Sequence, residues 1–93
     1  MQMTTPRSLT LGKQTYDAHE RRVGELTTYI VTQRRRGKLH IGDIEPALRG
    51  PHAGKWRGFV RTKRERTFRH IGTFTTSDAA MSEICRSYHG PIL

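Results

Sequence analysis

Two kinds of side chain alternate over residues 56–62, the most regular pattern in the chain. Small or apolar side chains occupy one set of alternate positions: Trp56, Gly58 and Val60. Charged and aromatic side chains occupy the other: Arg57, Phe59 and Arg61. A period of two is typical of a strand with one buried face. With a charged turn at 63–66 and a second strand at 67–73, the pattern predicts an antiparallel hairpin whose first set of positions faces the core.

The segment after this hairpin has the period of a helix. Its apolar side chains recur three and four residues apart and would form one stripe along the helix: Ala80, Met81, Ile84, Cys85 and Tyr88. Thr75, Thr76 and Ser77 offer hydroxyl groups that can cap the first amides, and Asp78 follows them in the first turn. The pair Gly90-Pro91 predicts the end of the helix. We expect the stripe to cover one face of the sheet.

Residues 26–32 favour a strand, because almost all are β-branched or aromatic and such residues pack well on a pleated sheet. A turn at 34–37, in which Gly37 supplies a positive φ, and a paired strand at 38–44 would follow. The apolar residues on one face of that paired strand are Leu39 and Ile41. The competing prediction extends a helix through this segment. Val23, Leu26 and Ile30 are spaced three and four residues apart and would share one face of that helix.

The other segments are mostly polar. Residues 1–14 predict a flexible N-terminal tail, and residues 16–22 predict one or two helical turns that Gly24 interrupts. Prolines and glycines within 45–54 predict a loop. We therefore expect residues 15–93 to form a single small α+β domain. Its three- or four-stranded antiparallel sheet would carry the C-terminal helix packed on one face and leave the other face open and basic.

Positive charge dominates the composition. The 93 residues include 17 Lys and Arg but 8 Asp and Glu, a formal net charge of +9. Such an excess attracts polyanions, of which nucleic acid is the commonest, although a solvated surface without a partner is the alternative. The densest cluster comprises Arg57, Arg61, Lys63, Arg64, Arg66 and Arg69. A second cluster, suited to phosphate contacts or simply solvated, comprises Arg34, Arg35, Arg36 and Lys38.

Aromatic side chains accompany the basic ones. Phe59 shares its predicted face with Arg57 and Arg61, and Phe68 and His70 share one face of the second strand. Aromatic rings among arginines suit stacking on bases or contact with thymine methyl groups, and guanidinium groups can read guanine edges in a major groove. Arginine and phenylalanine are also enriched in protein interfaces. Duplex DNA is therefore the expected partner, with RNA and an acidic protein surface as alternatives.

Other classes of function have less support. Cys85 is the only cysteine, which excludes an intramolecular disulfide and suggests a reducing, cytoplasmic location; its place on the apolar stripe predicts an inert, buried thiol. The histidines lack metal-ligand spacing and no catalytic motif is present, so we expect no enzymatic activity, metal or cofactor. No apolar run approaches the roughly 20 residues of a membrane span, and residues 1–10 lack the features of a signal peptide.

Three segments of the second half also carry a resemblance to known DNA-binding domains: 54–61, 71–76 and Ala79-Ala80. They resemble the APETALA2-type domain of plant ethylene-response factors. The stretch is also similar to the arm-binding N-terminal domain of phage and transposon tyrosine integrases. In those families three antiparallel strands pack on one helix, and the outer face of the sheet lies in the major groove. The resemblance implies an accessory or regulatory protein of a phage or other mobile element.

Individual positions carry this resemblance further. Arg61 matches a family arginine that contacts DNA, and Phe59 and His70 fall where the plant domains place DNA-facing Glu and Trp. The preceding strand is arginine-rich in the plant pattern but contains Asp43 here, and Glu45 follows it. The chain is thus predicted to be a small basic DNA-binding module that uses the open sheet face. The alternative is a protein-interaction domain that docks the same face on an acidic partner.

Overall fold

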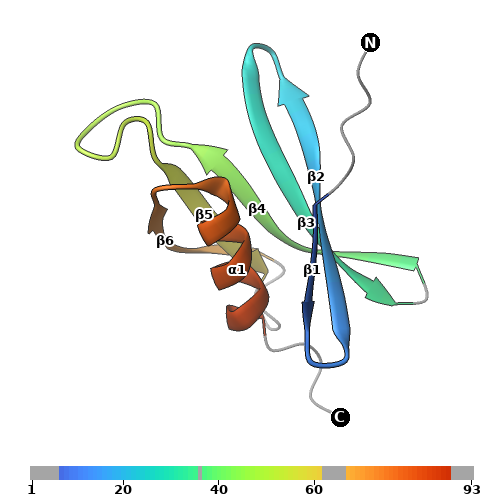
Figure 1. Cartoon of the computed structure of the whole chain (residues 1–93). Helices are drawn as coiled ribbons and strands as arrows, with labels where there is room; N and C mark the ends of the chain where they lie inside the picture. The colour runs from blue at the N-terminus through green and yellow to red at the C-terminus, as the bar shows by residue number, and fades with distance from the viewer. Residues whose placement is uncertain (1–6, 36, 62–66, 89–93) are drawn as a thin grey trace.

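The computed structural model describes residues 7–35, 37–61 and 67–88. Within them the elements are β1 (Arg7–Leu11), β2 (Gln14–Val23), β3 (Leu26–Arg35), β4 (Gly37–Pro46), β5 (Trp56–Arg61), β6 (Phe68–Phe74) and α1 (Ser77–Ser87). The strands form one antiparallel sheet in sequence order, curled around α1 (Figure 1). The α+β class and the C-terminal helix on one face are therefore confirmed. The expected three or four strands are wrong, because the described residues form six.

The additional strands are β1 and β2. Arg7–Leu11 belongs to the segment predicted as a flexible tail, and the predicted helical turns at 16–22 lie within β2. Both predictions are wrong because alternate side chains in these strands bury one face, which a strand permits and a helix does not. Leu9 lies opposite Tyr16 in the register, and both Tyr16 and Ala18 are buried. The start of the predicted tail lies outside the described residues.

The strand favoured for 26–32 is confirmed as the first part of β3, and the competing helix is wrong. Three of the four residues predicted as the turn at 34–37 lie in strands instead. Arg34 and Arg35 still belong to β3, and Gly37, which has a φ of 109°, already begins β4. The side chains of Arg34 and Arg35 therefore point to opposite faces of the sheet, because successive residues of a strand alternate.

A β-bulge interrupts the regular alternation of β4. The ladder with β3 passes from Gly42 to His40 and leaves Ile41 as an extra residue. A bulge changes the direction of the side chains beside it. Ile41 is fully buried and Leu39 packs against the same core, so the two share one face, as predicted, and this is the core face.

The hairpin predicted over 56–73 is confirmed as β5 and β6, although residues 62–66 lie outside the described part. Gly58 and Val60 are buried beneath the helix. Trp56 is half-buried on the same face, with its ring centroid 5.6 Å from that of Tyr29. The core face of this hairpin therefore has the predicted orientation.

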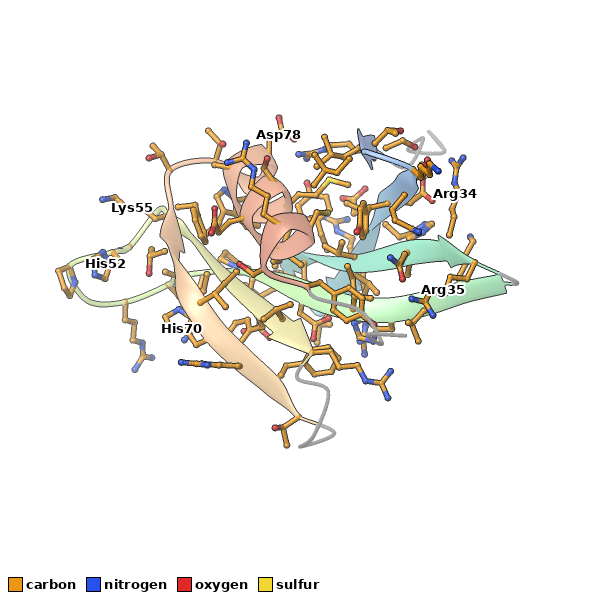
Figure 2. The ribbon with its side chains drawn as sticks, turned by 90° about the horizontal axis from the view of Figure 1, so that it is seen from below. Arg34, Arg35, His52, Lys55, His70 and Asp78 are labelled. Atoms are coloured by element: carbon orange, nitrogen blue, oxygen red, sulfur yellow. The ribbon has the colours of Figure 1, made fainter. Side chains whose placement is uncertain are left out.

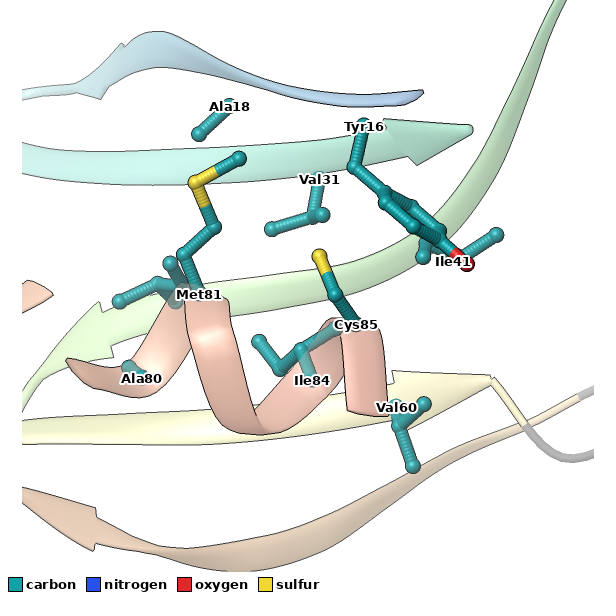
Figure 3. Packing of buried hydrophobic residues seen from close by; sticks show 10 residues of the cluster. Tyr16, Ala18, Val31, Ile41, Val60, Ala80, Met81, Ile84 and Cys85 are labelled. Atoms are coloured by element: carbon teal, nitrogen blue, oxygen red, sulfur yellow. The ribbon is translucent and has the colours of Figure 1, made fainter. Parts of the chain in front are cut away.

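The apolar stripe of α1 packs against the sheet and covers the core. Ala80, Met81, Ile84 and Cys85 are buried against the sheet (Figure 3). Tyr88 is partly buried and packs against the same cluster. Thr76 is the N-cap, since its side-chain oxygen accepts the amide of Ala79 at 3.1 Å. The predicted cap and stripe are confirmed. The helix ends at Ser87, and the pair Gly90-Pro91 lies outside the described residues.

Gly42 is the point of closest approach between the sheet and the helix. A Cβ atom there would lie 2.5 Å from Cγ2 of Ile84 and 2.6 Å from the backbone oxygen of Phe59. Both distances are well below ordinary van der Waals contact. The absence of a side chain at Gly42 therefore lets β4, β5 and α1 pack together.

Arg7 connects the first strand to the beginning of the helix. Its guanidinium donates to the hydroxyl of Ser77 at 2.8 Å, forms an ion pair with Asp78 and lies 4.8 Å from the ring centroid of Tyr29. β1 is one edge strand of the curled sheet, and α1 follows β6, which is the other edge strand. These contacts therefore connect the two edges of the sheet through the helix.

Candidate nucleic-acid interface

The face of the sheet opposite α1, here called the outer face, is set by the register of the strands. Residues directly opposite each other in an antiparallel pair point to the same face. Phe59 lies opposite Asp43 on one side and His70 on the other, while the neighbouring pair Val60 and Gly42 faces the core. The outer-face residues of β5 are therefore Arg57, Phe59 and Arg61, as predicted.

Two pairs of aromatic rings lie on this outer face. The rings of Phe59 and His70 have centroids 5.2 Å apart, and those of His40 and Phe68 have centroids 4.8 Å apart. Phe59, Phe68 and His40 are half-buried and His70 is exposed. Sequence reasoning identified Phe59, Phe68 and His70 but missed His40, although simple alternation with Leu39 and Ile41 places His40 on the outer face.

The structure divides the predicted basic residues between the two faces. Arg34 and Lys38 are register partners on the outer face, alongside Arg57 and Arg61. Arg35 lies on the other face, where its Nε donates to Oε1 of Gln33 at 2.8 Å. Arg69 also belongs to that face by its pairing with Val60, although its side chain is exposed. The predicted site residues outside the described part are Arg36, Lys63, Arg64 and Arg66.

Acidic residues share the outer face and pair with several of these bases. The carboxylate of Glu45 accepts a hydrogen bond from Arg57 at 3.3 Å, and Asp43 lies 2.8 Å from Nε2 of His40. The guanidinium of Arg57 is also 5.8 Å from the ring centroid of Phe59. The outer face is therefore less positive than the sequence of the hairpin 56–73 indicates, because the acids Asp43 and Glu45 come from the neighbouring strand β4.

A third acid, Asp17, is bound to Arg34. Its Oδ2 accepts Nε of Arg34 at 2.8 Å, and its Oδ1 accepts Nη2 at 3.0 Å and the hydroxyl of Ser8 at 2.6 Å. The hydrogen bonds from Arg34 hold the pKa of Asp17 below its ordinary value, and the hydroxyl of Ser8 acts in the same direction. The same bonds raise the pKa of Arg34.

The two ends of the sheet carry different groups. Successive antiparallel strands reverse direction, so β3 and β5 end at one end of the sheet, where β4 and β6 begin. Figure 2 shows Arg34 and Arg35 at this end, with His52 and Lys55 at the opposite end. Arg34, Lys38 and Arg61 lie on or beside the first end and thus form the basic edge of the outer face.

The opposite end includes a loop that sequence reasoning predicted at 45–54, two residues too early at its start, and did not consider as a contact surface. Glu45 and Pro46 complete β4, and residues 47–55 form the loop. The amide of Ala47 donates to the carbonyl of Lys55 at 2.8 Å, and the amide of Gly54 donates back to Ala47 at 3.0 Å. The loop contains no acid, and its basic side chains include Arg49 and Lys55.

Comparison with protein-family models, curated proteins and solved structures found no match to this chain. Within the described residues, no group of three or more His, Cys, Asp or Glu side chains is placed to hold a metal ion. The helix in that part of the chain is too short to cross a membrane. Cys85 is buried, and burial raises the pKa of its thiol to about 12.

Proposed function

We propose that this chain is a small duplex-DNA-binding module whose outer face contacts the nucleic acid. One observation supports it most strongly. The face of β4, β5 and β6 opposite the helix combines exposed basic side chains with two aromatic pairs, Phe59–His70 and His40–Phe68. The net charge of +9 adds a general attraction for a polyanion. The resemblance of 54–61 and 71–76 to sheet-face DNA readers supports the same proposal.

The side chains of this face would have different roles. Lys38, Arg34 and Arg61 form its basic edge and would bind phosphates, which supplies affinity without reading sequence. Phe59 and His70 lie nearer its centre, where an aromatic ring can contact base edges or thymine methyl groups in a major groove about 12 Å wide. Arg57 is shared between Glu45 and the ring of Phe59, so its phosphate contact would compete with the ion pair.

The experiment that tests this proposal is a titration of the full chain with a duplex of about 20 base pairs between about 50 and 200 mM salt. We expect affinity to fall steeply with salt. The double variant Lys38→Ala, Arg61→Ala should weaken binding by about three- to tenfold and reduce the slope of log K against log salt by about 2, because two phosphate contacts are lost.

The matched control is the double variant Arg49→Ala, Lys55→Ala, which removes the same charge from the loop at the other end of the sheet. It should affect binding less and leave the slope closer to that of the unaltered chain. Two results would remove the proposal: undetectable binding of the unaltered chain at low salt, or an equal loss in the two double variants. Competition with single-stranded DNA and with RNA tests whether the duplex is the preferred form.

The second candidate function is docking on an acidic protein surface. The acids that pair with His40 and Arg57 favour it, because they reduce the attraction of this face for a polyanion, whereas aromatic residues and arginine remain enriched in protein interfaces. A complex purified from cells separates the two functions. If it survives nuclease treatment and is lost on Phe59→Ala, a protein partner is supported and the duplex proposal loses its main contact.

A further inference from the structure

Arg34 differs from the other bases of the outer face because its orientation is fixed. Two parallel hydrogen bonds join it to Asp17, from Nε at 2.8 Å and from Nη2 at 3.0 Å. A paired arrangement of this kind fixes the plane of the guanidinium as well as its position. The hydroxyl of Ser8 on β1 binds the same carboxylate at 2.6 Å. Three adjacent strands therefore contribute to the orientation of Arg34.

Asp17 and Arg34 differ in exposure, and this difference indicates which of the two side chains extends toward solvent. The Asp17 side chain is 5% exposed, whereas that of Arg34 is 60% exposed. The carboxylate thus lies within the surface of the sheet, and the guanidinium extends from it toward solvent. None of the bonds between the two residues uses Nη1. Among the described residues, the Nη1 donors are therefore available to a second acceptor while the bonds to Asp17 remain.

We propose that Asp17 is a positioning residue that holds Arg34 ready to bind a phosphate of the nucleic acid. This inference rests on the proposed function. A free arginine loses side-chain entropy when it binds a phosphate, whereas an arginine already fixed in the binding orientation loses less. The carboxylate itself repels a phosphate. Asp17 therefore has two opposed effects, and the proposal states that positioning outweighs repulsion.

The opposed effects give a test based on the direction of change. Asp17→Asn removes a negative charge and weakens the hold on Arg34. If charge alone matters, this variant binds a DNA duplex more tightly than the unaltered chain. If Asp17 positions Arg34, the variant binds about three- to tenfold more weakly and its salt slope falls by about 1, the contribution of one phosphate contact. The control Asp43→Asn makes the same charge change on the same face and should bind as tightly as the unaltered chain or more tightly.

A double-mutant cycle shows whether Asp17 acts through Arg34. Arg34→Ala alone should weaken binding, and adding Asp17→Asn to it should cause no further loss, because the residue to be positioned is absent. A further loss in the double variant would indicate that Asp17 supports the fold in another way and would overturn the proposal. Circular dichroism of each variant establishes that the comparison is between folded proteins.

Arg34→Lys provides a second variant that keeps the net charge. The side chain of Arg34 is largely exposed, so we expect this substitution to leave the fold intact. Lysine cannot form the planar pair with Asp17, so this variant should bind duplex DNA more weakly than the unaltered chain, with a reduced slope. Two results would overturn the positioning role and leave the proposed function standing. One is that Arg34→Lys binds as tightly as the unaltered chain, and the other is that folded Asp17→Asn binds as tightly as the unaltered chain or more tightly. If the unaltered chain does not bind a duplex at low salt, the proposed function fails and the inference fails with it.

Discussion

Glu45 on β4 lies directly opposite Arg57 on β5, and its carboxylate accepts a hydrogen bond from the guanidinium at 3.3 Å. Both side chains are nearly half exposed, so the pair is screened by solvent and adds little to stability. Its main consequence is that Arg57, near the start of β5, already has an acidic partner. Any phosphate that binds Arg57 must compete with Glu45.

Replacing Glu45 with Gln should therefore tighten binding to duplex DNA. The change removes a negative charge from the outer face and frees Arg57, so we expect affinity to rise by about two- to fivefold at low salt. A salt-dependent titration measures it. Glu25→Gln, the same charge change at the exposed turn between β2 and β3, is the control and should have a smaller effect. Unchanged or weaker binding in Glu45→Gln would contradict the role assigned to Arg57.

Gly42→Ala should destabilise the fold by about 1–3 kcal/mol, as expected for overpacking in a well-packed core. The new methyl group would meet the backbone oxygen of Phe59 at 2.6 Å, and a backbone atom cannot move away without shifting β5. Gly58→Ala should cost less, because its closest contact is the Phe74 ring at 3.1 Å, which a side-chain movement can relieve. Urea denaturation of both variants tests this order, and equal stability losses would contradict it.

The lowered pKa of Asp17 predicts a pH dependence of stability. A carboxyl whose pKa is depressed by folding stabilises the protein at pH values above its ordinary pKa, about 4. This contribution is lost as the pH falls through the lower pKa of the folded state. Asp17→Asn should therefore be less stable than the unaltered chain at neutral pH, and the difference should shrink as the pH falls toward about 2. A difference in unfolding free energy that does not change with pH would contradict the assignment.

Cys85 should resist thiol reagents in the folded protein. Its side chain is buried, and burial raises the pKa of the thiol to about 12, so the reactive thiolate is scarce near neutral pH. We expect modification at about pH 8 to be on the order of 100-fold slower than in denaturant, because it requires the protein to open. Similar rates with and without denaturant would show that α1 does not cover the thiol.

The parts of the fold that could be predicted are those with a strong local period. The alternation at 56–62 and the helical stripe from Ala80 to Tyr88 each describe a face that packs against one neighbour, and both are confirmed. β1 and β2 were missed because polar residues interrupt their apolar ones. The buried position of Asp17 has no local signal, because its partners Ser8 and Arg34 come from the adjacent strands.

A signal for these strands was nevertheless present. Leu9 and Leu11 alternate, as do Tyr16 and Ala18, and a two-residue turn that begins with Gly12 separates the two pairs. Glycine at the first position of such a turn is typical of hairpins. Gly12 indeed has a φ of 61°. Considered together, the alternation on both sides of Gly12 favours a hairpin over a tail.

The sequence predicts which basic and aromatic residues belong to the candidate site, but it does not predict how they are arranged on the sheet. The alternation of β5 predicted that Arg57, Phe59 and Arg61 share the outer face. The local pattern did not show that Arg34 and Arg35 would separate to opposite faces, because that depends on where the turn begins. The pairing of Glu45 with Arg57 depends on the register between β4 and β5, which involves residues 12 positions apart.

The central claim is that the outer face of the sheet binds duplex DNA. An amide-shift titration of the full chain with a short duplex at several salt concentrations tests it most directly. We predict that shifts concentrate in β5, in β6, at the end of β3 and at the start of β4, around Arg34, Lys38, Phe59 and His70, and that α1 and the loop 47–55 change little. Shifts spread over all lysines and arginines, or concentrated in the loop 47–55, would contradict the claim.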